Sequence, residues 1–165
     1  MSKNKYTISD YDANTNLKVS SELWLVMVYF LHPLMLMITS VQIGRGAKNS
    51  NVSLLKEAMY PDNFSLFIAI VAALPAILVI FTTFKRKPEA SDLIKKLWRN
   101  GANFLTASAI ISITTLIKPL SQITLNHIAM IDLTHGIQLV IAIGILIFLH
   151  TSQRVKDTFA DFPQD

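Results

Sequence analysis

One stretch of the chain decides its fold: residues 85–99 read KRKPEASDLIKKLWR. This segment, the basic connector, holds six of the 15 lysines and arginines and lies between two long apolar runs. A loop this rich in basic residues between two membrane spans stays on the cytoplasmic side of the bilayer. We therefore expect an integral membrane protein in which the basic connector sets the direction of every span.

The amino-acid composition favours the same class. Apolar residues make up 52% of the 165 positions and charged residues 16%, whereas soluble domains have about 25% charged residues. The net charge of +4 comes from loops and chain ends, without a stripe of aromatic and basic residues, so we expect no nucleic-acid partner. The absence of cysteine excludes disulfides and thiolate metal sites.

Four segments are predicted to cross the bilayer, because about 20 apolar residues span its core. They are residues 23–43, 64–84, 103–124 and 128–150. The third is the weakest, since its unbroken apolar part is only residues 104–117 and carries several Ser and Thr side chains. Such a span is expected inside the bundle, with its hydroxyls bonded to its own backbone or to neighbouring helices.

The predicted fold class is all-α: a polytopic membrane protein with four transmembrane helices in two hairpins. Within the basic connector, Leu93, Ile94, Leu97 and Trp98 recur at helical spacing, which predicts a short interfacial helix before the third span. A second short amphipathic helix is expected over residues 52–60.

Charge counting predicts the topology. Residues 1–22, the basic connector and the tail 151–165 together carry eleven basic residues, against four on the opposite side. Both termini are therefore expected in the cytoplasm. The first apolar run follows 22 mostly polar residues and is too long for a signal-peptide core, so we interpret it as an uncleaved span.

Several residues predict how the spans begin, bend and pack. Ser20 or Ser21 can cap the first span, and Pro33 and Pro75 are expected to bend the first and second. In the second span, Ala69 and Ala73 are four positions apart, as are Ala72 and Ala76. This small-residue spacing lets another helix approach closely.

The sharpest candidate site is an intramembrane polar set in the fourth span. Asp132 and His135, three positions apart, share a helix face, and ionisable groups inside a membrane are costly and often functional. The pair would relay protons or bind a cation. The structural alternative is an ion pair between Asp132 and Lys118 at the end of the third span.

His32 is the only ionisable residue deep in the first span. It would either complete a site with His135 or hydrogen-bond to a neighbouring helix. His127 and His150 lie at the two ends of the fourth span and are assigned to the interface. No metal-ligand spacing, phosphate-binding loop, nucleophile motif or nicotinamide motif occurs, so we expect no metal, cofactor or catalytic residue.

Three pieces of sequence resemble a known family. They are Tyr11-Asp12 with Leu17-Lys18 before the first span, Tyr60-Pro61-Asp62 with Phe64 entering the second, and Leu74-Pro75-Ala76 within it. In this order they are similar to a family of small inner-membrane proteins of gammaproteobacteria, domain of unknown function 2919. The resemblance covers most of the chain and implies a multi-pass protein of the bacterial inner membrane. It implies no activity, substrate or site residue.

Two functions are expected from these observations. The first is a non-catalytic accessory protein that packs against itself or other membrane proteins, favoured by the small-residue face of the second span and the polar third span. The alternative is a small oligomeric transporter or proton-coupled carrier that uses Asp132, His135 and His32. The lipid bilayer is the expected surrounding in both.

Overall fold

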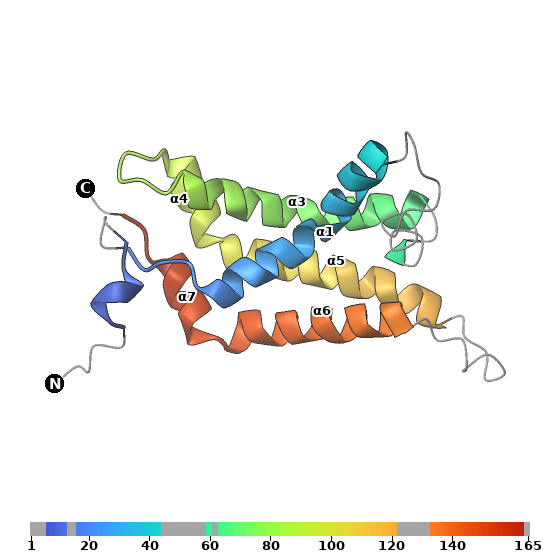
Figure 1. Ribbon diagram of the computed structural model, residues 1–165. Helices are drawn as coiled ribbons and strands as arrows, with labels where there is room; N and C mark the ends of the chain where they lie inside the picture. Colours follow the sequence, from blue (N-terminus) through green and yellow to red (C-terminus); the bar gives the residue numbers. More distant parts are fainter. Residues whose placement is uncertain (1–5, 13–15, 44–58, 61–62, 122–132, 164–165) are drawn as a thin grey trace.

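The computed structural model describes residues 6–12, 16–43, 59–60, 63–121 and 133–163, with the side chains of 40–43, 118–121 and 133–134 excepted. Four long helices run along one another: α1 (Ser21–Ile43), α3 (Asn63–Phe84), α5 (Gly101–Ser121) and α6 (Leu133–Thr151) (Figure 1). Three short ones gather at one end of the bundle: the 3-10 helix η1 (Ile8–Asp10), α4 (Asp92–Arg99) and α7 (Gln153–Ala160). The predicted all-α class is confirmed.

The described helices contain two to four candidate membrane spans. α1, over Ser21–Thr39, and α3 are each long and apolar enough alone. α4 with α5, and α6 with α7, reach the same length and composition only as pairs, bent by 52° and 63°. The expectation of a polytopic membrane protein is thus confirmed. The first residues of the predicted fourth span and most of the predicted helix over 52–60 lie outside the described residues.

The long helices pack as two hairpins. α1 lies against α3 and α5 against α6, while α3 and α5 join the pairs. α5 has a neighbour on both sides, as predicted for a partly polar span. Its Thr114 and Thr115 hydroxyls donate to backbone carbonyls one turn earlier, at 2.8 and 3.1 Å. These bonds satisfy the hydroxyls without a partner from another chain.

The small residues of α3 are buried inside the bundle. Ala72, Ala73 and Ala76 are at most 2% exposed, because α3 packs against both α1 and α5. The spacing that predicted close helix approach is therefore correct, but the helices that approach belong to the same chain. This buried face of α3 cannot serve as the surface for a partner, so it no longer supports an accessory role.

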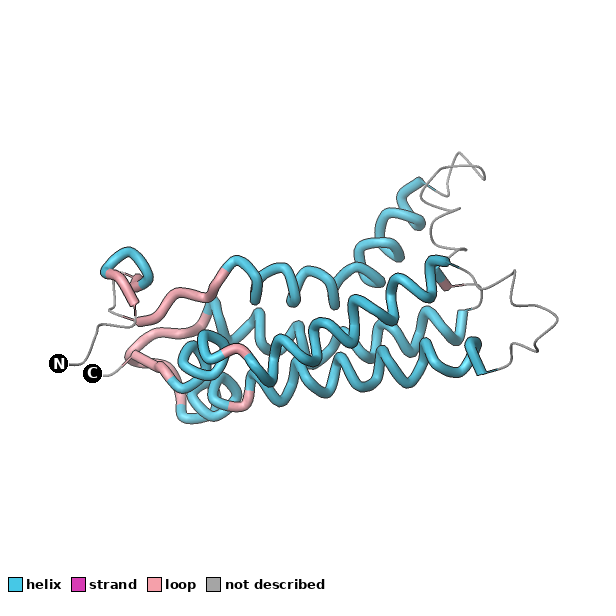
Figure 2. The backbone as a smooth tube through the Cα atoms, turned by 90° about the horizontal axis from the view of Figure 1, so that it is seen from below, coloured by secondary structure: helices cyan, strands magenta, loops and turns pink. Residues whose placement is uncertain are grey.

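α1 begins and bends where the sequence indicates. The Ser20 hydroxyl accepts a hydrogen bond from the Leu23 amide at 3.3 Å, so Ser20 caps the helix. Pro33 lies inside the helix, and the part that follows it projects away from α3, α5 and α6 in both views (Figures 1 and 2). Met35 and Ile38 on this part are 58% and 52% exposed.

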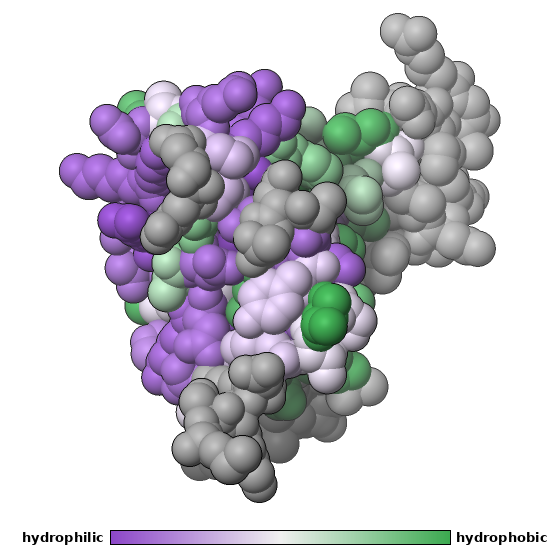
Figure 3. Space-filling view, turned by 90° about the vertical axis from the view of Figure 1, so that its left-hand side faces the viewer, coloured by the Kyte–Doolittle hydropathy of each residue, from purple (hydrophilic) through white to green (hydrophobic). Residues whose placement is uncertain are grey.

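Both ends of the described chain lie at the end of the bundle that carries the basic connector (Figure 1). This end, which we call the cap, comprises residues 6–12 and 16–20, the basic connector and residues 152–163. Seen end on, hydrophilic side chains gather there (Figure 3). The four spans predicted from the sequence require this arrangement of termini.

The terminal segment is not simply a charged tail, which corrects the sequence interpretation. Ser152 caps α7 by accepting from the Val155 amide at 3.4 Å, and the inner face of α7 is buried through Val155, Thr158 and Phe159. Gly101 permits this docking, because a Cβ there would lie 2.2 Å from Cε1 of Phe159. The short length of α7 and its charges concealed this apolar face.

Candidate functional site

A polar cluster inside the helical bundle starts from the bend of α1. Pro33 has no backbone N–H, so the carbonyl of Tyr29, four residues earlier, lacks its helical donor. Nδ1 of His32 takes that place and pairs with the Tyr29 carbonyl oxygen. A carbonyl oxygen can only accept, so Nδ1 carries the proton. The adjacent proline therefore fixes the tautomer of the histidine.

Tyr60 completes the other side of the imidazole. Its hydroxyl lies 2.6 Å from Nε2 of His32, and the two rings lie nearly parallel at 24°, with centroids 6.0 Å apart. In the neutral imidazole whose Nδ1 bears the hydrogen, Nε2 accepts and the Tyr60 hydroxyl donates. Both polar atoms of the ring are thus satisfied by the chain itself. His32 therefore joins α1 to the segment before α3.

A small cavity adjoins this cluster. Its volume is about 30 Å³, enough for one or two water molecules. Six of the residues that line it are polar or aromatic with a polar group: Tyr29, His32, Tyr60, Ser112, Thr115 and Gln138. The Tyr29 hydroxyl donates to the Gln138 carbonyl at 3.2 Å, while the Gln138 side-chain nitrogen is buried without an acceptor among the described residues. Such a cavity is a site for water.

The predicted site is only partly assembled from the described residues. His32 lies in the cluster, whereas His135, in the first turn of α6, is half-buried and is not one of the described residues that line the cavity. Asp132 lies outside the described residues, and Lys118 belongs to α5 but its side chain is not described. The Asp132–His135 relay and the Asp132–Lys118 ion pair both stay predictions. His32 bonds to its own helix and to Tyr60 in the segment before α3, and both alternatives for His32 stay predictions.

Tyr29, Tyr60 and Gln138 were not predicted as site residues. Tyr60 was missed because its partner His32 lies 28 positions away in the sequence. One local signal was available: a histidine directly before a mid-helix proline can reach the carbonyl that the proline leaves free. Gln138 lies on the same helical stripe as Asp132 and His135, three positions after the histidine.

A second cluster, in the cap, surrounds Arg86 of the basic connector. Its guanidinium donates to the carbonyls of Leu17 and Asp161 at 2.9 and 2.8 Å. It also forms an ion pair with the Asp161 carboxylate at 3.3 Å. Burial lowers the pKa of Arg86, and the nearby Asp161 and Asp12 carboxylates oppose that change. Arginine stays protonated under these conditions, so Arg86 is a buried cation that ties three segments together.

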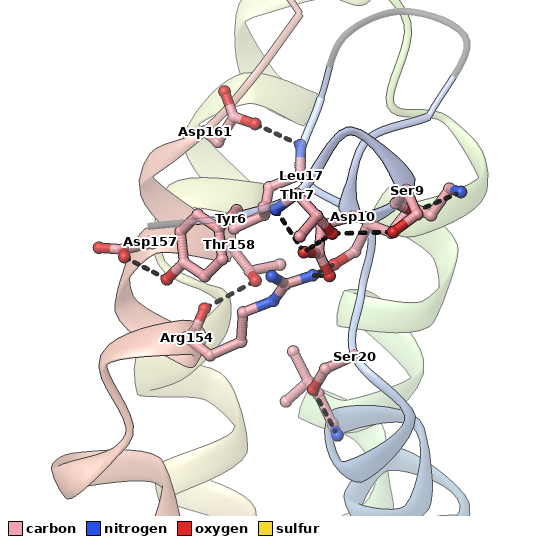
Figure 4. Close-up of polar contacts among 12 residues, drawn as sticks. Tyr6, Thr7, Ser9, Asp10, Leu17, Ser20, Arg154, Asp157, Thr158 and Asp161 are labelled. Carbon is pink, nitrogen blue, oxygen red and sulfur yellow. Dashed lines mark hydrogen bonds and ion pairs between the residues drawn. The ribbon is translucent and has the colours of Figure 1, made fainter. Parts of the chain in front are cut away.

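A second arginine ties the N-terminal segment to α7. Arg154 pairs with the Asp10 carboxylate at 3.3 Å, and its Cζ lies 4.5 Å from the centroid of the Tyr6 ring. The Tyr6 hydroxyl donates to Asp157 one turn along α7 (Figure 4). These contacts hold residues 6–10 against α7, so the two ends of the described chain pack against each other.

The family profile of DUF2919, described as a protein of unknown function, matches residues 6–161. The chain belongs to the DUF2919 family. The match runs from Tyr6, which bonds to α7, to Asp161, which pairs with Arg86, so it includes the whole cap contact. No curated protein and no solved structure matches the chain.

In this DUF2919 protein four residues of the motifs that carried the resemblance have described packing contacts. Tyr11 and Leu17 form an isolated antiparallel β-bridge in the cap. Tyr60 bonds to His32, and Ala76 is fully buried in the main hydrophobic core. The described contacts of these four residues support the fold.

Proposed function

We propose that this DUF2919 protein is a non-catalytic protein of the bacterial inner membrane that works by lateral association, with a second copy of the same chain as its partner. The observation that supports this is the path of α1. Its second half leaves the bundle after Pro33 (Figure 2), so a surface that would otherwise pack within the chain faces the membrane.

The shape of one molecule favours a second copy. The part of α1 after Pro33 projects from the bundle formed by α3, α5 and α6 (Figures 1 and 2). Two copies related by a two-fold axis would each lay this half-helix along the flank of the other. One self-complementary surface is enough to close such a dimer.

The projecting half-helix has the chemistry of a helix-packing surface in lipid. Met35 and Ile38 are apolar and exposed. Thr39 has already satisfied its hydroxyl on the Met35 carbonyl at 2.7 Å. Because lipid tails are as apolar as these side chains, close packing rather than the hydrophobic effect would stabilise the contact. The interface is therefore proposed at α1 and not at the small-residue face of α3, which the bundle itself covers.

The proposed orientation places the cap in the cytoplasm. Nine of the 15 basic residues belong to the cap, and loops rich in lysine and arginine remain cytoplasmic. Both termini lie beside the basic connector (Figure 1), so one orientation serves all three segments.

Cross-linking in native membranes tests the proposal, and the absence of cysteine gives a clean background. Ile38→Cys would be treated with a membrane-permeable bismaleimide. The expected product is a species of twice the 18.5 kDa chain mass. Leu25→Cys is the matched control, because it is 70% exposed on the half of α1 that stays in the bundle. Equal products from both positions, or monomer alone, would contradict the proposal.

A further inference from the structure

A second pocket lies where the spans meet the cap. It has a volume of about 310 Å³ and is lined by Asp12, Lys18, Val19, Trp24, Thr83 and Arg86. These residues come from the N-terminal segment, the first turn of α1, the last turn of α3 and the basic connector. A pocket at the ends of two spans lies at the level of the lipid headgroups.

One wall of the pocket suits the edge of a bilayer. Trp24 is half-buried and its ring contacts Phe84 at the end of α3, with centroids 6.2 Å apart. Tryptophan is enriched at the membrane interface, where its ring is apolar and its N–H remains wet. Val19 extends the apolar wall. A ligand in the pocket would therefore have an apolar side as well as a charged one.

Two cations line the pocket. The Lys18 ammonium donates to the Ser9 carbonyl at 2.9 Å, which leaves two of its three N–H groups. Arg86 has a side chain only 5% exposed, and its Nε–H has no acceptor among the described residues. Charge-assisted bonds from lysine and arginine are the usual way to hold a phosphate.

One carboxylate lines the same pocket. Asp12 accepts from the Asn16 amide at 3.0 Å and from the Asn16 side chain at 3.3 Å, and an ionised carboxylate has about four lone-pair sites in all. A carboxylate beside the cations disfavours a ligand that is only anionic. It favours a ligand that brings a positive group of its own.

We propose that this pocket binds a phosphodiester that carries a primary ammonium, as in the headgroup of a phosphatidylethanolamine lipid. The phosphate would pair with Lys18 and Arg86, and the ammonium would donate to Asp12. This assignment does not depend on the proposed dimer. It predicts that the pocket prefers an ethanolamine headgroup to two others. A choline headgroup has no N–H to donate to Asp12, and a glycerol headgroup has no positive group to offset the Asp12 carboxylate.

Native mass spectrometry of the full chain in mild detergent tests the assignment. Equal amounts of phosphatidylethanolamine, phosphatidylcholine and phosphatidylglycerol would be supplied. The ethanolamine lipid should be retained over both others. Lys18→Gln should weaken its affinity about ten-fold, as expected for loss of one charge-assisted bond. Asp12→Asn should reverse the preference towards phosphatidylglycerol. Lys87→Gln, an exposed lysine of the basic connector outside the pocket, should change nothing.

Two outcomes would overturn the proposal: equal retention of the three lipids, or an unchanged preference in Asp12→Asn. Lys18 is exposed, so Lys18→Gln keeps the test valid if Asp12→Asn is misfolded by circular dichroism. Soluble phosphoethanolamine provides a further arm. Competition by it at the same affinity as the lipid would support the headgroup chemistry and assign the site to a soluble ligand.

Discussion

Arg86 and Trp98, two residues of the basic connector, stack on each other. The guanidinium Cζ lies 4.7 Å from the centroid of the indole ring, and the indole N–H donates to the carbonyls of Thr158 and Asp161 at 3.1 and 2.9 Å. Trp98 is fully buried. The basic connector is therefore more than a topological signal, because it forms the centre of the cap and receives the C-terminal segment.

Replacement of Arg86 by lysine should destabilise the cap almost as much as replacement by glutamine. Lysine keeps the charge but loses the planar fork that reaches Leu17 and Asp161 together, and it loses the stacking on Trp98. We expect a loss of about 2–3 kcal/mol in the free energy of unfolding. Thermal unfolding in detergent, followed by tryptophan fluorescence, measures it.

The control for this prediction is Lys87→Gln, one residue along. Lys87 is exposed, so its replacement should change stability by less than about 0.5 kcal/mol. A wild-type midpoint for Arg86→Lys would show that charge alone matters at this position.

Gly101→Ala should loosen the docking of α7. The new Cβ would lie 2.2 Å from Cε1 of Phe159, so the ring or the helix must move, at a cost of about 1–3 kcal/mol. Hydrogen exchange of residues 153–160 should increase. Phe159→Ala removes the clashing ring, so the double variant should show less than the sum of the single effects. Additive effects would mean that the two residues do not meet.

Pro33→Ala should reduce the dimer cross-link at Ile38→Cys. Alanine restores a backbone N–H that competes with His32 for the Tyr29 carbonyl, so α1 loses the cause of its bend. The comparison is made on the Ile38→Cys background in membranes, at matched expression levels. An unchanged yield of cross-linked dimer would show that the association does not depend on Pro33.

Tyr60→Phe should weaken the cluster around His32. The variant keeps the ring but removes the hydroxyl that lies 2.6 Å from Nε2 of His32, and the loss of one hydrogen bond costs about 0.5–1.5 kcal/mol. The unfolding midpoint in detergent should fall. Tyr11→Phe is a suitable control, because Tyr11 is exposed in the cap; a similar fall there would argue against a specific role for the Tyr60 hydroxyl.

Acid should detach the N-terminal segment. Hydrogen bonds from the Thr7 side chain and backbone lower the pKa of Asp10 below 3.8. Because the folded-state pKa is the lower one, the contribution of Asp10 is present above the unfolded pKa and is lost as the pH falls through the folded pKa. Hydrogen exchange of residues 7–11 should rise below about pH 4. In Asp10→Asn this rise should be absent; its persistence would assign the transition to another group.

Much of the fold could be predicted from the sequence. The length and apolarity of the α1 and α3 segments indicated spans, and the periodicity of Leu93, Ile94, Leu97 and Trp98 indicated α4. The central place of α5 followed from its hydroxyl side chains. These predictions succeeded because each depends on residues within one helix. The docking of α7 was missed because its buried face, which includes Val155 and Phe159, spans only eight residues among charges.

The candidate site was harder to predict for a related reason. His32 was identified from its own span, but Tyr60 lies 28 positions away and the Gln138 carbonyl lies 109 positions from the Tyr29 hydroxyl that binds it. No local pattern contains such pairs. They exist only once α1, α3 and α6 are packed together.

The sequence by itself determined that this chain is a helical membrane protein, because hydropathy and helical periodicity are properties of contiguous residues. Its short motifs resembled the DUF2919 family, and the family profile matches residues 6–161. The tertiary structure alone decided which polar groups meet. Arg86 binds Asp161 across 75 positions, and Tyr6 binds Asp157 across 151. A buried polar group must find a partner, and the packing of the helices determines which partner is within reach.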